Sequence, residues 1–161
     1  MEREDDGRHD FDFLHGSWRI HNRRLARRLE GCIDWEEFTA TYECYPVLGG
    51  LGNVDHFHAV FTDGKPLEGM SIRLFDPATG RWSIFWADNR RSRLDPPVVG
   101  RLEHGRGEFV GDDVLDGTPI HVSFRWSDIT PTSARWEQAF SADGGTTWET
   151  NWVMEMTKIT T

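Results

Sequence analysis

The stretch SIRLFDPATGRWSIFWAD, residues 71–88, predicts two β-strands joined by a tight turn. Ile72 and Leu74 alternate with their neighbours before the turn, and Trp82 and Trp86 do so after it. Such alternation places every second side chain on one face of a sheet. The segment DPATG between the two runs supplies proline and glycine, which favour a turn. The stretch therefore predicts a β-hairpin.

The same alternation continues outward from this hairpin in both directions. Further strands are expected near residues 17–28, 34–45, 53–61, 98–103, 106–112, 119–126, 133–140 and 147–159. About ten strands at regular spacing, with turn residues between them, indicate an all-β barrel or sandwich. Helix is expected only as one short turn in DFDFLHG, near the N-terminus. With 161 residues and no long linker, residues 1–161 are expected to form a single domain.

The segment SADGGTTW, residues 141–148, fits the Asp-box pattern S-x-D-x-G-x-T-W of sialidase-type β-propellers. A propeller needs about four or more blades and leaves a repeat of roughly 40–50 residues. The chain contains one Asp-box and no second copy, so the propeller is rejected. We interpret the motif as a hairpin turn and expect Trp148 to enter the core.

The composition of the chain argues against nucleic acids and membranes as partners. The net charge of −9 disfavours nucleic acid, whose binding depends on excess lysine and arginine. The basic run RIHNRRLARR, residues 19–28, is interpreted as solvated strand charges and ion pairs. No apolar run approaches the ~18 residues of a membrane span, and the charged N-terminus does not resemble a signal peptide. Because Cys32 and Cys44 suggest neither a disulfide framework nor a metal site, a cytoplasmic location is expected.

A tryptophan is expected to close one end of the barrel. Trp18 lies in the G-x-W segment at the start of the first strand, directly after the short helical turn. Counting by two along the last strand puts Trp148, Thr150, Trp152, Met154, Met156 and Lys158 on one face. Lys158 is therefore expected to cover Trp18.

Several segments together resemble a bacterial family of unknown function with a lipocalin-like, calycin-type barrel. The resemblance rests on FDFLHGSWRIHNRRL, VLGGLGN, RLFDPATGRWSIFWAD, PPVVG and RWEQAFSADGGTTWETNW, and it covers nearly the whole chain. It implies the fold and no activity, because a fold alone does not determine function.

Polar residues that face the interior are the first candidates for a site. Asn22 and Arg24 share a face with Trp18, and Gln138 shares one with Trp152 if the last hairpin has a simple register. These polar groups either satisfy one another or contact a ligand. Trp86 and Trp152 are candidates to line a pocket, although core packing is the plainer role for both.

His56 and His58 form an H-x-H pair that could place two imidazoles on one metal ion. No third ligand is evident nearby, so no metal and no cofactor are expected. Arg73 and Arg125 each lie in the middle of an apolar strand, where an arginine either faces solvent or has a buried partner. Asp88, Glu137 and Glu149 are the candidate partners.

The sequence thus predicts a mostly antiparallel barrel of about ten strands that binds a small, partly apolar and anionic ligand. The predicted ligand-binding residues are Asn22, Arg24, His56, His58, Arg73, Trp86, Gln138 and Trp152. One alternative is an enzyme, a cyclase, isomerase or hydratase, that uses acids and bases such as His56 and Asp88. Another is a filled barrel that acts as a homodimer. A cavity of several hundred cubic ångströms would favour either of the first two over the filled barrel.

Overall fold

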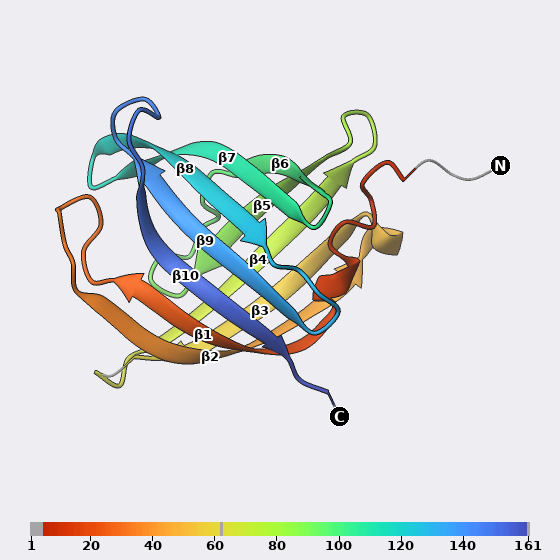
Figure 1. The fold of residues 1–161 in the computed structure, drawn as a ribbon, viewed down its shortest axis with the longest axis horizontal. Helices are drawn as coiled ribbons and strands as arrows, with labels where there is room; N and C mark the ends of the chain where they lie inside the picture. Colours follow the sequence, from red (N-terminus) through yellow and green to blue (C-terminus); the bar gives the residue numbers. More distant parts are fainter. Residues whose placement is uncertain (1–4, 62, 161) are drawn as a thin grey trace.

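The computed structural model describes residues 5–61 and 63–160. Ten strands and two short 3-10 helices follow one another along this part of the chain (Figure 1). Their bounds are η1 Asp12–Leu14, β1 Gly16–Leu25, β2 Trp35–Val47, η2 Leu48–Gly50, β3 Gly52–Val60, β4 Pro66–Asp76, β5 Arg81–Asp88, β6 Val98–Glu103, β7 Arg106–Leu115, β8 Thr118–Ser127, β9 Ser133–Ser141 and β10 Glu149–Lys158. None of the described helices is long and apolar enough to cross a bilayer.

The ten strands form one closed antiparallel barrel. Each strand pairs with the next one in the chain, and β10 pairs with β1, so that the sheet has no free edge (Figure 1). The predicted all-β barrel of about ten strands is therefore confirmed. The shortest strand pairing joins residues 82–84 of β5 to residues 98–100 of β6.

One end of the barrel is closed by a plug around Trp18. The Trp18 side chain is fully buried, and its Nε1 donates a hydrogen bond to the Leu14 carbonyl oxygen at 2.9 Å. Lys158 Nζ lies 5.6 Å from the Trp18 ring centroid, a cation–π distance. The expected cover of Trp18 by Lys158 is thus confirmed.

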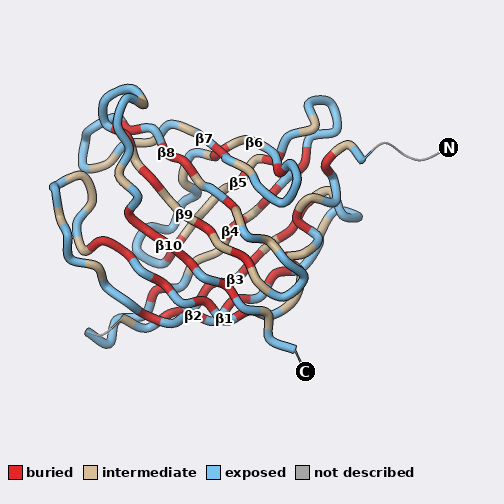
Figure 2. The backbone as a smooth tube through the Cα atoms, viewed as in Figure 1, coloured by how far each residue is buried: buried red, intermediate tan, exposed pale blue. Residues whose placement is uncertain are grey.

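Aromatic rings from other elements complete this plug. Phe11, which directly precedes η1, packs edge-on against Trp82 with ring centroids 5.1 Å apart, and it also contacts Phe109 and Trp126. All four side chains are buried. Figure 2 shows how buried and exposed positions alternate along the strands that hold them. The end of the barrel where β1 begins is therefore filled.

A β-bulge changes the predicted face of the last strand. The β9–β10 register shifts between Thr150 and Trp152, so that Asn151 is an extra, buried residue. Trp152 faces the interior, whereas Thr150 is exposed. The expectation that Trp148 enters the core is wrong: its side chain is 36% exposed and its Nε1 donates to the Gly145 carbonyl oxygen.

The Asp-box itself forms the predicted turn between β9 and β10. Asp143 accepts hydrogen bonds from the Thr147 backbone N–H at 2.8 Å and from the Ser141 hydroxyl at 2.8 Å. Gly144 and Gly145 take φ angles of 73° and 90°, which favour glycine. The motif therefore builds a local turn.

The middle of strand β4 turns two polar side chains inward and two apolar side chains outward. Ser71 and Arg73 are buried, whereas Ile72 is half-buried and Leu74 is 36% exposed on the outer face. This arrangement requires partners for the inward polar groups, and they lie on β3.

Candidate functional site

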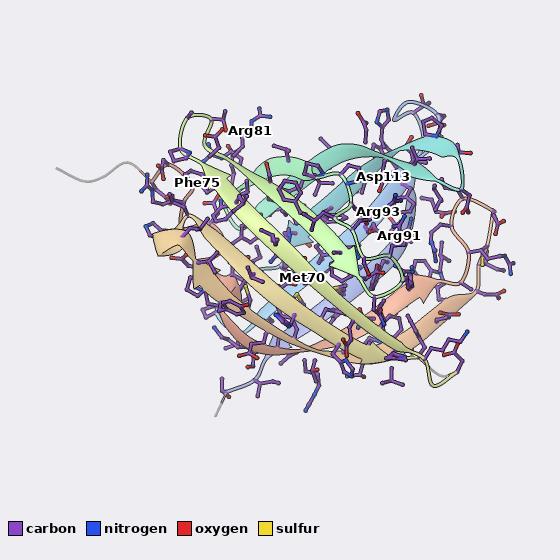
Figure 3. The ribbon with its side chains drawn as sticks, turned by 180° about the vertical axis from the view of Figure 1, so that it is seen from behind. Met70, Phe75, Arg81, Arg91, Arg93 and Asp113 are labelled. Carbon is purple, nitrogen blue, oxygen red and sulfur yellow. The ribbon has the colours of Figure 1, made fainter. Side chains whose placement is uncertain are left out.

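The end of the barrel opposite the plug contains an open cavity of about 340 Å³, which we call the mouth. Arginines line one part of it, with Arg24 at the end of β1 and Arg90 in the β5–β6 loop. Asp113 on β7 lines another part. Figure 3 labels Arg91 and Asp113 at this end of the molecule, while Phe75 lies at the other end. The mouth therefore carries charged groups around its cavity.

A second cavity of about 60 Å³ lies deeper in the barrel, and we call it the lumen. Its walls are mostly aromatic and aliphatic, with Trp126, Trp136 and Met154 among them, while Tyr42 and Arg73 supply polar groups. Such a space accommodates a few water molecules or part of a small ligand.

Three residues separate the mouth from the lumen and line both cavities: Trp86, Gln138 and Trp152. We call them the neck. The Trp86 and Trp152 rings meet edge to face, with centroids 6.4 Å apart and planes at 84°. A ligand that reaches from the mouth into the lumen must therefore pass these three side chains.

Arg24 is a buried cation at the neck that lacks an acidic partner. Its side chain stacks on Trp152 with the guanidinium carbon 4.7 Å from the ring centroid, and the residue is only 8% exposed. Its Nε has no hydrogen-bond partner, and no carboxylate among the described residues lies within ion-pair distance. Burial, followed by the nearby Arg28 and Arg90, lowers the pKa of Arg24 to about 9. The charged form is thus held at a free-energy cost that an anion would relieve.

Asp88 holds Trp86 in the neck. Its carboxylate accepts a hydrogen bond from Trp86 Nε1 at 2.9 Å and pairs with Arg90 at 2.8 Å. Burial alone would raise the pKa of Asp88. Hydrogen bonds from Arg90 and Trp86 outweigh this effect and lower the pKa to about 2. Asp88 therefore remains ionised at neutral pH and holds the Trp86 ring in place by accepting its hydrogen bond.

Gly69 provides the seat for the Trp86 ring and was not among the predicted site residues. A Cβ atom added at Gly69 would lie 2.0 Å from Trp86 Cη2. A glycine inside a strand often marks a position where another group approaches the backbone closely, and this is the signal that the sequence offered.

Arg73 faces the interior, and its partner is Asp55, not any of the three acids predicted from the sequence. Arg73 Nη1 lies 2.7 Å from Asp55 Oδ2, and both side chains are buried. Asp55 also accepts hydrogen bonds from the Tyr42 hydroxyl at 2.6 Å and from the Ser71 backbone N–H at 2.8 Å. Of the two arginines predicted to meet the ligand, Arg73 already has a counterion and Arg24 has none among the described residues.

The side-chain amides of Asn22 and Gln138 form hydrogen bonds inside the barrel. Asn22 Oδ1 accepts a hydrogen bond from Trp152 Nε1 at 3.0 Å, and its Nδ2 donates to the Phe38 carbonyl oxygen at 3.3 Å. Gln138 Nε2 donates to Asn151 Oδ1 at 2.8 Å. Asn22 therefore positions Trp152, while Gln138 borders both cavities.

His56 and His58 project from the outer face of β3 and do not join the interior group. Both are exposed, because they alternate with Asp55 and Phe57, which point inward. These two histidines, which the sequence predicted as ligand-binding residues, line neither the mouth nor the lumen. Arg125 also lies outside, where it pairs with Glu108 at 3.1 Å.

Within the described ranges, no group of three or more His, Cys, Asp or Glu side chains is placed to hold a metal ion. We expect the purified protein to carry no stoichiometric zinc or iron, because a zinc site needs at least three protein ligands. Elemental analysis checks this. One metal per chain, lost in a His56→Ala/His58→Ala variant, would contradict the expectation.

The comparisons with known proteins concern the fold. A scan for protein families finds no matching family, and a search of curated proteins finds no match either. Among solved structures, the S-type phycobiliprotein lyase CPES from Guillardia theta matches with a TM-score of 0.62 and 12% identity, over 94% of this chain and 91% of that chain.

Two further matching structures are a de novo designed barrel and a fluorophore-bound protein. The first, a de novo design of a fluorescence-activating β-barrel, has a TM-score of 0.52 and 12% identity, over 93% of this chain and 98% of that one. The protein EF1p2_mFAP2b bound to DFHBI has a TM-score of 0.51 and 10% identity, over 95% and 99%. At these identities the likeness shows a shared barrel fold.

Proposed function

We propose that this chain binds a small, partly apolar, anionic molecule, with its acidic group at Arg24 and its apolar part against the neck. The observation that carries the proposal is the Arg24 guanidinium, which is 8% exposed and has no counterion among the described residues. A buried charge without a partner is costly, and a bound anion would supply that partner.

The cavities and the neighbours support the same proposal. The mouth, at about 340 Å³, falls within the roughly 300–1,000 Å³ typical of ligand pockets. Trp86 and Trp152 supply the flat apolar surface. The protein EF1p2_mFAP2b, which is bound to DFHBI, has a similar barrel fold, so a barrel of this kind can hold a small molecule.

The experiment measures binding of 2-naphthoate and its uncharged analogue 2-naphthol by calorimetry and tryptophan fluorescence. We expect naphthoate to bind more tightly than naphthol and to change the fluorescence of the neck tryptophans. Arg24→Gln should weaken naphthoate roughly 10- to 100-fold, because hydrogen bonds to charged groups contribute about 1.5–3 kcal/mol. Binding of naphthol should change little.

Arg27→Gln is the matched control, because it removes the same charge from the same segment. Arg27 is exposed, and its Nε lies 3.3 Å from Glu30 Oε2. It does not line the mouth cavity. Equal losses in the Arg24 and Arg27 variants would show only a long-range charge effect and would remove Arg24 from the site. If aromatic acids, fatty acids and steroids all fail to bind, the proposed function is wrong.

The two alternatives have weaker support. For the enzyme, His56 lies on the outer surface and Asp88 is engaged by Trp86 and Arg90, so this acid–base pair does not meet. A filled barrel that forms a homodimer is favoured by one row of apolar residues across four strands on the outer face: Tyr45, Val54, Ile72 and Phe85. Light scattering would test self-association.

Four sequence predictions remain proposals beside the ligand. We infer that residues 1–161 form a single domain, that the chain is cytoplasmic, that it needs no cofactor, and that it belongs to the bacterial calycin-type family it resembles. The ten-stranded closed barrel supports the last of these at the level of fold. Limited proteolysis would test the domain, and a family-wide sequence alignment would test the membership.

A further inference from the structure

Three arginines line the mouth, and only one of them has an ion-pair partner among the described residues. Arg24, Arg28 and Arg90 all line the mouth cavity. Of the three, only Arg90 has an acidic partner within ion-pair distance among the described residues, namely Asp88 at 2.8 Å. Arg28 Nη1 reaches only the Leu25 carbonyl oxygen, at 3.5 Å. Arg24 and Arg28 are therefore the two arginines of this group without an ion-pair partner among the described residues.

These arginines repel one another in a partly buried place. Burial first, and Arg90 next, lower the pKa of Arg28, while Arg28 and Arg90 add to the effect of burial on Arg24. Asp116, Glu36 and Glu149 act on the pKa of Arg28 in the opposite direction, but none of them lies within ion-pair distance of it. In the part of the chain that the structure describes, Arg24 and Arg28 are therefore two cations of the mouth that no ion pair neutralises.

We propose that the acidic group of the ligand is a dianion of the phosphate monoester type, bound by Arg24 and Arg28 together. This inference rests on the proposed ligand-binding function and specifies its head group. A carboxylate or sulfonate carries one negative charge and would leave one of the two arginines unmatched. A phosphate monoester carries about −1.5 to −2 at pH 7 and offers three acceptor oxygens. Planar guanidinium groups match such oxygens in pairs.

The remainder of the ligand follows from the position of Arg24. Because its guanidinium lies 4.7 Å from the Trp152 ring, a phosphate bound there has its ester oxygen beside the neck. The organic group then lies against Trp86 and Trp152 and extends toward the lumen. The class of ligand is therefore an aromatic or otherwise apolar phosphate monoester.

The test compares two ligands with the same ring, 2-naphthyl phosphate and 2-naphthalenesulfonate, by calorimetry at constant ionic strength. At pH 7.5 we expect the phosphate to bind roughly tenfold more tightly, because it engages a second arginine. At pH 5 this preference should disappear, because the second phosphate pKa is about 6 and the ester becomes a monoanion. Arg28→Gln should remove the preference at pH 7.5, whereas Arg27→Gln should keep it.

Titration of the protein's own groups between pH 5 and pH 7.5 does not account for the expected change in the ratio of the two affinities. The positive groups of the mouth are Arg24, Arg28, Arg90 and Arg91, and its negative groups are Asp95, Asp113 and Asp116. No histidine is among the described lining residues of the mouth. Burial raises the pKa of Asp95, but its protonation acts on both ligands in the same direction and largely cancels in their ratio.

The outcomes separate this inference from the function on which it rests. Equal affinities for phosphate and sulfonate, unchanged in ratio by Arg28→Gln, would overturn the dianion and leave anion binding intact. Failure of both ligands, together with failure of naphthoate, would overturn the function as well. Inorganic phosphate that binds as tightly as naphthyl phosphate and displaces it would assign a free-phosphate site and overturn the monoester.

Discussion

Replacement of Trp18 by alanine is expected to lower the free energy of unfolding by about 3–5 kcal/mol, the usual cost of removing a large buried aromatic side chain. Trp18 has no exposed surface, donates a hydrogen bond to Leu14 and is covered by Lys158. For a chain of this length, each kcal/mol shifts the melting temperature by about 2–4 °C, so a decrease of roughly 6–20 °C is expected. Thermal denaturation followed by circular dichroism measures it.

Trp148→Ala is the matched control for this prediction. Trp148 lies on the Asp-box turn with 36% of its surface exposed, and its removal leaves no cavity in the plug. Its loss is expected to cost about 0.5 kcal/mol or less. An unchanged melting temperature for Trp18→Ala, or equal decreases for the two variants, would show that Trp18 does not hold the closed end.

The second large effect is expected at Asp55. Asp55→Asn should destabilise the protein by about 3–5 kcal/mol, because it leaves the buried Arg73 charge without its counterion. Burial alone would lower the pKa of Arg73, but the nearby Tyr42 and Asp55 raise it above its ordinary value. Urea denaturation measures the change. An unchanged dependence of the unfolding free energy on urea concentration would show that the variant and the wild type unfold alike.

A double-mutant cycle separates the ion pair from the rest of the polar cluster. The Asp55→Asn/Arg73→Met variant removes both charges, so we expect it to be more stable than Asp55→Asn alone. The carboxamide at position 55 can still accept the Tyr42 hydroxyl hydrogen bond. If the two single losses simply add in the double variant, the buried pair is not coupled and this account of the interior is wrong.

The sequence was sufficient to predict a barrel of about ten strands and its closed end. Alternation in residues 71–88 predicted β4, β5 and the turn between them, because the period of two is a local property of the chain. The G-x-W segment and Lys158 were found for the same reason: both lie at strand ends whose pairing follows from a simple barrel. Trp86, Gln138 and Trp152 are also among the residues that the sequence predicts for the site, and all three line both cavities.

Other features depend on pairings that no local pattern records. The bulge at Asn151 reverses the face of residues before it, and so Trp148 turned out to be exposed. Asp55 was missed as the partner of Arg73 because their contact follows from the β3–β4 register, in which Asp55 lies opposite Ser71. The mouth arginines come from separate segments, around Arg24 and Arg90, and only the closed sheet brings these together.

The plug at the Trp18 end has a kinetic consequence for any ligand that reaches the lumen. With that end filled by buried aromatic rings, a molecule must arrive and leave through the same opening, past Trp86 and Trp152. A bulky side chain at the rim therefore slows association and dissociation by the same factor and leaves the equilibrium constant unchanged. Residence time and affinity are thus separable in this barrel, the first set by the width of the opening and the second by the contacts beyond it.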